Sequence, residues 1–343
     1  RTSVRLAPQS RWAAWSGFVF LTSGFLISAV FLMGQFDVIH LFFSMLGLYY
    51  LLQGRRRAFV AAFAVAMAIK WFPLFIFLPV LLLVEKRVSR ILLCLAGVLS
   101  VAFVFKVPFL FSENPSAKTG SDLIAFMVLD NRLPLGSGGV PIFPLLFVLV
   151  CVASYVRRPG STAELHRTAV YAGFAGLAAF FVSAPAFPYW FAMLCPFLAI
   201  LWAINPALAR VNLLLETGLT AVMIVLHQII FFWTYDLSIV SPMLLPRIFE
   251  PVGSLADPVS PLGLYTRLGL VSDSSVLAAI FTAGIVCLLV LHRPRTDEDL
   301  ALLTPDDDQV VALVHVRTAL MLGLMLVPAA AYLYSLIAHG TAA

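Results

Sequence analysis

Charged residues are scarce in this chain. Only 11% of its 343 residues are Asp, Glu, Lys or Arg, whereas 62% are hydrophobic. A soluble domain of this length could not hide so much apolar surface from water, whereas a helical membrane protein has lipid as its solvent. The composition therefore excludes a soluble enzyme and predicts an all-α polytopic membrane protein whose first partner is the lipid bilayer.

A large basic patch is also missing. The formal net charge is +5, and the basic residues fall in short clusters between apolar runs. Proteins that bind nucleic acid concentrate Lys and Arg on one face, whereas short basic clusters beside apolar segments follow the positive-inside rule of membrane proteins. We therefore expect no nucleic-acid partner, and we expect a multi-pass protein of the cell membrane.

Cysteine is rare, and the common cofactor motifs are absent. The four cysteines lie in four separate apolar segments without metal-ligand spacing: Cys94, Cys151, Cys195 and Cys287. This pattern predicts buried thiols rather than a disulfide framework. No Walker loop, GxGxxG fingerprint, HExxH motif or zinc spacing occurs. No cofactor is therefore expected and no metal ligand is assigned, and a divalent metal stays open.

The apolar runs predict about eleven transmembrane or half-transmembrane helices in a single domain, residues 1–343. The expected segments are 13–33, 38–52, two halves of 58–84, 91–109, 141–155, 166–183, 191–204, 211–233, 274–291 and 314–337. The stretches 112–140 and 234–273 are predicted external loops, and 293–310 a cytoplasmic acidic loop. Arg1, Arg5 and Arg11 precede the first segment and place the N-terminal end in the cytoplasm.

Residues 58–84 can be interpreted in two ways. A single helix would be about 40 Å long at 1.5 Å per residue, which is enough to cross a core of about 30 Å. A hairpin of two half-length helices would instead place the arginines at 55–57 and the basic residues at 86–90 on the same side. The balance of Lys and Arg along the chain favours the hairpin. Pro73 also favours it, because proline restrains the residue before it away from helical geometry.

Polar residues gather where the second segment is expected to begin. Asp37 and His40 are three residues apart and therefore share one helix face, and Gln35 precedes them on the turn. A carboxylate, an amide and an imidazole at an external helix start can bind a polar substrate or transfer a proton. A structural interpretation of Asp37 is also open, because Asp at a helix start often accepts backbone N–H bonds as an N-cap.

Lys70 is the single charge inside the apolar stretch 58–84. A lysine at the membrane centre costs about 2.5–3.5 kcal/mol on insertion scales. At the tip of a hairpin facing protein it would need an anion, and a lipid phosphate from the outer leaflet would serve. The alternative is that its ammonium reaches the interface beside Trp71.

The turn Pro185 to Trp190 is rich in aromatic residues and fixed by proline. Tyr189 and Trp190 are candidates for the wall of an outward-facing groove that binds lipid or sugar. The alternative is an aromatic belt at the membrane interface joined to a rigid turn.

At these residues the chain resembles a known family. The resemblance is carried by Gly34-Gln35-Phe36-Asp37, the arginine run 55–57, Ala68-Ile69-Lys70-Trp71-Phe72-Pro73, the return to Lys86-Arg87, and Phe187-Pro188-Tyr189-Trp190 with Pro196. These motifs resemble the GT-C superfamily of integral membrane glycosyltransferases. They are most similar to bacterial mannosyl- and glucosyltransferase-like proteins that use polyprenol-phosphate sugars.

The resemblance implies a GT-C-like fold and an inverting sugar transferase whose active site is extracytoplasmic. The donor would be a polyprenyl-phosphate sugar, and the acceptor a glycan, a lipid or a protein. Lys70 would lie near the lipid phosphate, and Gln35 and Asp37 would line the donor or acceptor cavity. Within that family the catalytic acid usually lies in the first external loop. No loop here matches it, so we expect the main catalytic acid upstream of Arg1, with Asp37 as the catalytic candidate within this chain.

Two other functions remain open from the sequence. A polysaccharide polymerase would be expected to use arginines in large external loops, and the candidates are Arg132, Arg247 and Arg267. A transporter or flippase of lipid-linked sugars would need polar residues along a continuous path through the membrane. The polar residues identified above gather in the outer half, which disfavours transport.

Overall fold

The computed structural model describes residues 12–32, 35–111, 128–134, 139–184, 187–205, 208–230, 266, 268–269, 271, 274–294, 311–323 and 326. Over these residues the chain is all-α, apart from one antiparallel pair of two-residue strands, β1 (Arg132–Leu133) and β2 (Val140–Pro141). The predicted loops 112–140, 234–273 and 293–310 lie mostly outside this part of the chain.

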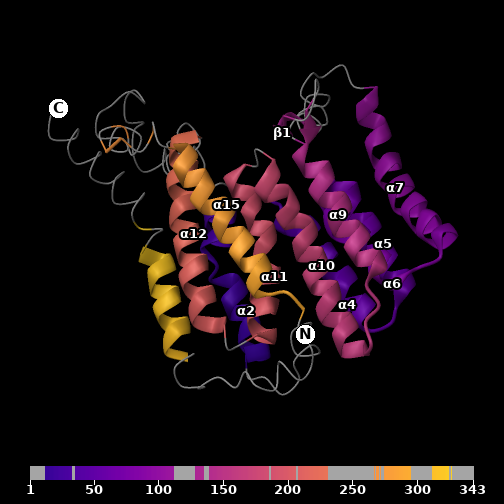
Figure 1. Ribbon diagram of the computed structural model, residues 1–343, viewed down its shortest axis with the longest axis horizontal. Coiled ribbons are helices and arrows are strands. Elements are labelled where there is room, and N and C mark those ends of the chain that lie inside the picture. The colour runs from indigo at the N-terminus through magenta and orange to yellow at the C-terminus, as the bar shows by residue number, and fades with distance from the viewer. Residues whose placement is uncertain are drawn as a thin grey trace, which may run out of the picture.

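The helices form one bundle (Figure 1). They are α2 (Trp12–Leu21), α3 (Gly24–Ile27), the π-helix η1 (Ser28–Leu32), α4 (Val38–Leu52), α5 (Arg56–Ile69), α6 (Pro73–Val84), α7 (Val88–Leu110), α9 (Ile142–Val156), α10 (Thr162–Ser183), the 3₁₀-helix η2 (Pro188–Leu194), α11 (Cys195–Ile204), α12 (Ala209–Ile230), α15 (Ser274–Leu291) and a helix over Val311–Gly323.

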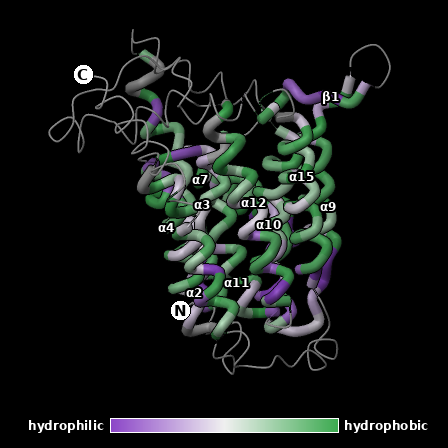
Figure 2. The backbone as a smooth tube through the Cα atoms, turned by 90° about the vertical axis from the view of Figure 1, so that its left-hand side faces the viewer, coloured by the Kyte–Doolittle hydropathy of each residue, from purple (hydrophilic) through white to green (hydrophobic). Residues whose placement is uncertain are grey.

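Three described helices are long and apolar enough to cross a membrane. They are Val88–Val107, Thr162–Ser183 and Ala209–Leu226, and several further apolar helices are shorter. Figure 2 shows hydrophobic residues along most of the bundle, with hydrophilic ones mainly toward its two ends. The chain therefore has the apolar helices of a membrane-associated protein, and eleven crossings remain a prediction.

The first expected segment, 13–33, is not one continuous helix. The helix α2 ends at Leu21, and Ser23 has an extended backbone with φ −66° and ψ 128°. The hydroxyl of Thr22 donates to the carbonyl of Phe18 at 2.8 Å, and the helical path resumes at Gly24. The expectation of an unbroken span was wrong here, because serine and threonine hydroxyls bond locally and compete with the helix.

The stretch 58–84 is a helical hairpin, as predicted. The helix α5 ends at Ile69, Lys70 has an extended backbone, and α6 begins at Pro73. The ring of Phe77 lies 5.2 Å from that of Phe59, although collinear helices would separate these residues by about 27 Å at 1.5 Å per residue. At the open end Arg56 contacts Glu85 at 3.2 Å, so the two helices run antiparallel and Lys70 lies at the tip.

The centre of the bundle is the contact between α6 and α10. Phe75 of α6 stacks on the fully buried Phe180 of α10, with 5.4 Å between their ring centres. A Cβ atom at Gly176 would overlap the backbone carbonyl oxygen of Phe75. The two helices therefore approach so closely that only glycine fits, and this contact fixes the hairpin against the rest of the bundle.

Replacing Gly176 by Ala should lower the free energy of unfolding by about 1–3 kcal/mol, the usual cost of overpacking a core. The control is Gly97→Ala on α7, where a Cβ meets nothing within 4 Å, and this change should be neutral or slightly stabilising. Thermal unfolding in detergent measures both variants. Equal stability of the two would contradict the close contact between α6 and α10.

Glu85 lies at the open end of the hairpin, outside the apolar segments, where it contacts Arg56. The backbone N–H of Arg87, with that of Lys86 and the guanidiniums of Arg90 and Arg56, holds the pKa of Glu85 below its usual value. A lowered pKa in the folded state stabilises the fold above the unfolded-state value of about 4.3. This contribution is lost as the pH falls through the folded-state pKa.

Glu85→Gln should therefore be less stable than the parent chain at pH 7, and the difference should shrink as the pH falls below about 4.3. The unfolding midpoint between pH 7 and pH 3.5 measures this. Asp130→Asn removes an exposed carboxylate and serves as the control. Its difference in stability from the parent chain is not expected to shrink as the pH falls. A constant difference for Glu85→Gln at every pH would contradict the assignment.

Candidate functional site

Asp37 immediately precedes α4, in the N-cap position. Its side chain makes no capping hydrogen bond to the helix, so the structural interpretation of this residue as an N-cap acceptor was wrong. Its Oδ1 instead accepts a hydrogen bond from the Nζ of Lys70. The Asp37 side chain is 3% exposed and that of Lys70 is 24% exposed, so this is an ion pair largely removed from water.

The hairpin brings the lysine to the aspartate. The helix α5 stops at Ile69 and leaves Lys70 extended at the tip, one residue before Trp71. The Nζ of Lys70 also lies 5.4 Å from the ring centre of Phe36, within the range of a cation–π contact. The anion that the sequence predicted for Lys70 is therefore supplied within this structure by Asp37.

His40 lies one turn further along α4 and is 2% exposed. Its Nε2 lies 3.4 Å from the Oδ1 of Asp37, and its ring stacks on that of Phe72 with 6.4 Å between centres. Three buried atoms here have no hydrogen-bond partner among the described residues: both ring nitrogens of His40 and the Oδ2 of Asp37. Leaving one buried polar group unsatisfied costs about 1–3 kcal/mol, so these atoms are suited to contact a ligand.

An aromatic wall borders these residues. Trp190 lies 4.6 Å from Phe72 and 4.7 Å from Phe187, measured between ring centres. Its Nε1 is buried without a partner in the described chain. Tyr189 is half-buried and stacks on Phe187 at 5.6 Å. The sequence-predicted Tyr189 and Trp190 therefore join the polar residues through Phe72.

We call Asp37, His40, Lys70, Tyr189 and Trp190 the tip site. The sequence predicted all five, and tertiary packing brings them together. Gln35, the sixth candidate, lies on the same turn and is half-exposed. Its backbone N–H donates to the carbonyl of Ala29 at 2.9 Å.

An apolar groove of about 580 Å³ runs along α4. It begins at Val38, beside the tip site, and continues along Leu41, Phe42 and Met45. Its other walls come from α2, α3, η1 and α11, with Gly17, Leu26, Val30 and Ala199 among the lining residues. We call it the α4 groove. Its lining residue Val38 directly follows Asp37 in the sequence, and the tip-site residues are not among the residues that line it.

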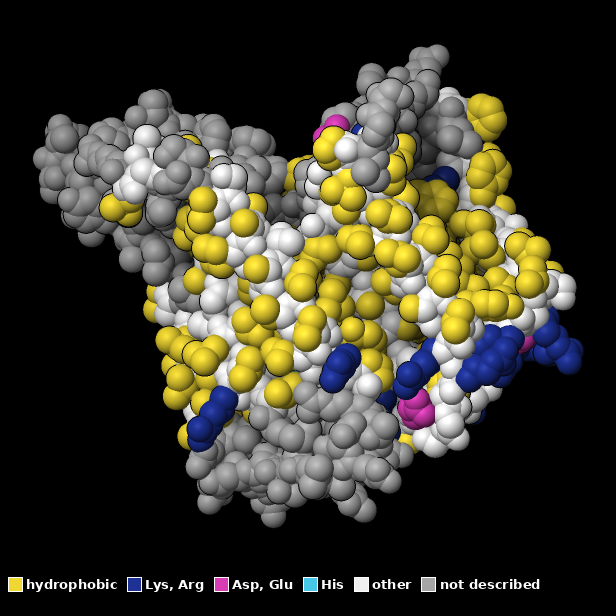
Figure 3. Space-filling model, in the orientation of Figure 1, with side chains coloured by type: hydrophobic (Ala, Val, Ile, Leu, Met, Phe, Trp, Pro, Cys, Tyr) yellow, Lys and Arg dark blue, Asp and Glu magenta, His cyan; other side chains and the backbone are white. Residues whose placement is uncertain are grey.

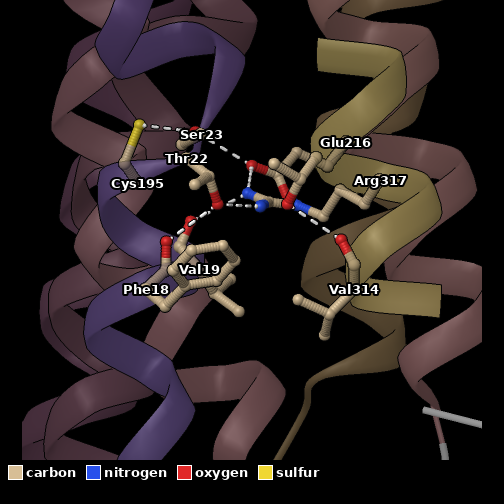
Figure 4. Close-up of polar contacts among 9 residues, drawn as sticks. Phe18, Val19, Thr22, Ser23, Cys195, Glu216, Val314 and Arg317 are labelled. Atoms are coloured by element: carbon tan, nitrogen blue, oxygen red, sulfur yellow. Dashed lines mark hydrogen bonds and ion pairs between the residues drawn. The ribbon is translucent and has the colours of Figure 1, made fainter. Parts of the chain in front are cut away.

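A second buried polar group was missed by the sequence analysis (Figure 4). The guanidinium of Arg317 donates from Nε to one oxygen of Glu216 at 2.8 Å and from Nη2 to the other at 2.6 Å. Ser23 donates to Glu216 at 2.9 Å, and Arg317 donates to Thr22 at 2.8 Å. An acid and a base inside two different apolar segments were the signal that could have identified this pair.

Further buried polar contacts lie toward the start of α12, and we call them, together with Glu216, the polar row. The side chain of His292 is buried between Asn205, at 3.0 Å from its Nδ1, and Asn212, at 2.9 Å from its Nε2. Asn212 lies one helical turn before Glu216. The sequence analysis did not predict these buried polar contacts, and the expected gathering of polar residues in the outer half remains a prediction. The cavity beside this row is only about 20 Å³, which holds about one water molecule.

Among the described residues, no three His, Cys, Asp or Glu side chains gather as a metal site. The four cysteines are free thiols, and Cys195 is fully buried with its Sγ 3.2 Å from the Oγ of Ser23. The expectations about a metal and cofactors remain predictions.

Arg317→Gln should lower the free energy of unfolding by about 3–5 kcal/mol, because it leaves the carboxylate of Glu216 buried without its ionic partner. The double variant Glu216→Gln/Arg317→Gln removes both charges and should recover part of the loss. Denaturant unfolding of the purified protein measures both. The single variant Glu216→Gln is measured as well. If the double variant lost as much free energy of unfolding as the two single variants added together, the proposed coupling between Glu216 and Arg317 would be wrong.

Comparison of the chain with protein-family profiles, with curated proteins and with solved structures found no match. The resemblance to GT-C glycosyltransferases therefore remains a prediction from short sequence motifs.

Proposed function

We propose that this protein is a membrane glycosyltransferase that takes a sugar from a polyprenyl-phosphate donor and passes it to a hydroxyl of a glycan, lipid or protein acceptor. The observation that carries the proposal is the ion pair of Lys70 with buried Asp37 at the hairpin tip. The α4 groove is the surface that we propose for the polyprenyl chain, because it is apolar and its lining residue Val38 directly follows Asp37 in the sequence.

The chemistry follows from the polar atoms of the tip site. The acceptor hydroxyl attacks the anomeric carbon from the face opposite the phosphate, so the configuration inverts. The new bond forms from the acceptor oxygen to the anomeric carbon, and the bond from that carbon to the phosphate oxygen breaks. The polyprenyl phosphate leaves with the electron pair, and the acceptor proton passes to a base.

Each residue has a role in this scheme. The ammonium of Lys70 stabilises the charge that develops on the leaving phosphate. The unpartnered Oδ2 of Asp37 and the imidazole of His40 are the available proton acceptors on this chain. Gln35, Tyr189 and Trp190 border the sugar, where aromatic faces and an amide can contact its hydroxyls. The proposal places the site on the extracytoplasmic side of the cell membrane.

The test uses proteoliposomes of the full chain with radiolabelled polyprenyl-phosphate hexose and a mixture of glycan and lipid acceptors. Lys70→Met should reduce sugar transfer by about 10²–10³-fold, the usual effect of removing one charge-stabilising donor. Lys70→Arg keeps the charge and should retain part of the activity. Arg57→Met removes an exposed cation at the opposite end of α5 and is the matched control.

The stability of each variant is measured beside its activity, because Lys70→Met leaves Asp37 without its ionic partner. The double variant Asp37→Asn/Lys70→Met removes both charges and should fold but remain inactive. Turnover by Lys70→Met at the parental rate in folded protein would contradict the role of Lys70. Absence of any sugar transfer by the parent chain with all acceptors would contradict the proposed function.

One observation favours a second candidate, transport of a lipid-linked sugar. The buried row from Asn205 through His292 and Asn212 to Glu216 extends polar groups along α12. The small cavity beside it is much narrower than a sugar, so transport would require the row to open. The same proteoliposomes separate the two functions, because transport moves the labelled donor across the bilayer without forming a glycosidic bond.

A further inference from the structure

A second large groove lies over α10, between α9 and α15, with a volume of about 530 Å³. Small residues of α10 line it at helical spacing: Ala172, Ala175 and Ala179. Leu146, Leu149 and Val150 of α9 and Val286 and Leu289 of α15 line its sides. We call it the α10 groove. It exists because alanines on α10 leave a gap that the larger residues of α9 and α15 do not fill.

The α10 groove ends at a basic end of the molecule. Arg157 lines it at the C-terminal end of α9, and Lys86, from the open end of the hairpin, donates to the carbonyls of Ser154 and Tyr155 at 3.1 and 2.6 Å. This places the α10 groove with the open end of the hairpin, away from the tip site. Figure 3 shows this face as largely hydrophobic, with Lys and Arg along its lower part.

The charge at this end is strongly positive over the described residues. Arg158 follows Arg157, Arg167 lies on α10, and Arg293 precedes Pro294, which lines the groove. Two described acids lie at this end: Glu85 contacts Arg56 and Arg90, and Glu164 accepts from the Nη2 of Arg157 at 2.6 Å. Arginine carries five N–H donors, so the guanidinium of Arg157 retains donors after this contact, and its side chain is 50% exposed.

The dimensions of the α10 groove match one leaflet of a bilayer. From Leu146 to Arg157 the helix α9 rises about 17 Å at 1.5 Å per residue. Half of a hydrocarbon core is about 15 Å thick.

The hydroxyl Oγ1 of Thr168, which lines the groove, is buried and has no hydrogen-bond partner in the described part of the chain.

We propose that the α10 groove binds one anionic phospholipid. An acyl chain lies on the alanines of α10, and the phosphate contacts Arg157 with the surrounding arginines. Basic pockets between membrane helices select anionic headgroups by this charge complementarity. The site is separate from the tip site, and it does not depend on the proposed glycosyltransferase activity.

The experiment uses the full chain purified in a neutral detergent and mixed with phosphatidylglycerol or phosphatidylcholine of identical acyl chains. Native mass spectrometry counts the lipids that are retained, and thermal unfolding measures stabilisation. The parent chain should retain one phosphatidylglycerol about tenfold more strongly than phosphatidylcholine, as expected for a hydrogen bond to a charged group. Equal retention of both lipids would overturn the proposal.

Two variants break the same ion pair with opposite expected results. Arg157→Gln removes the guanidinium and should abolish the preference for phosphatidylglycerol. Glu164→Gln also removes the contact of Glu164 with Arg157, but it leaves the cation free for phosphate and should keep or strengthen the preference. Loss of the preference in both variants would show a merely structural role of the pair and would overturn the proposed headgroup contact.

Filling the α10 groove with a large side chain tests whether an acyl chain lies in it. Ala153 is exposed and lines the groove one turn before Arg157, so Ala153→Trp should displace the lipid without disturbing the core. Leu93→Trp changes a residue that is 74% exposed on α7 and is the matched control. Retention of phosphatidylglycerol by folded Ala153→Trp at the parental level would overturn the proposal. The proposal would also be overturned if native mass spectrometry showed a dimer that forms through this groove and excludes lipid.

Discussion

The ion pair between Lys70 and Asp37 is the constraint that explains the architecture around the hairpin. Neither charge is stable alone in an apolar bundle, so each requires the other within contact distance. The contact requires that the stretch 58–84 turn back on itself and present its tip to the start of α4. The break of the helix at Lys70 and the antiparallel return from Pro73 supply that geometry. The close packing at Gly176 then fixes the returning helix against α10.

Two buried ion pairs in the described part of the chain differ in how completely their hydrogen-bonding groups are satisfied. Glu216 accepts from Arg317 through both oxygens and also from Ser23, so its charge is fully compensated. Asp37 accepts from Lys70 through one oxygen and leaves the other without a partner among the described residues. A closed network fixes structure, whereas an incompletely satisfied one retains the capacity to bind. This contrast is the physical reason for assigning function to the tip site and an anchoring role to Arg317.

The two large grooves lie in two different chemical settings. The α4 groove is lined by Val38, the residue after the buried carboxylate of Asp37, and its lining is apolar apart from Ser16. The α10 groove ends beside exposed arginines, which is a setting for a charged lipid surface. An apolar groove alone would not distinguish these functions. The polar residues near each groove carry the distinction.

The sequence by itself determined the all-helical class, the bounds of segments such as 38–52 and 274–291, and the hairpin with Lys70 at its tip. Hydropathy and the cost of a buried charge are local properties that can be read along the chain. The expected effect of Pro73 on the residue before it was wrong, because Phe72 has helical geometry, with φ −52° and ψ −34°, and the extended residue is Lys70. The sequence also predicted the members of the tip site, because each is a polar or aromatic residue at the edge of an apolar run. It did not predict that the span 13–33 is broken, because hydroxyls such as those of Thr22 and Ser23 also make local bonds within continuous helices.

Only the tertiary structure decided which charges meet. Glu216 and Arg317 are 101 residues apart, and no local pattern relates them. The buried position of His292 between Asn205 and Asn212, and the groove over the alanines of α10, likewise depend on which helices are neighbours. Helix neighbours in an apolar bundle are chosen by side-chain shape and close approach at glycines. These are properties of pairs of surfaces, and a linear sequence does not display them.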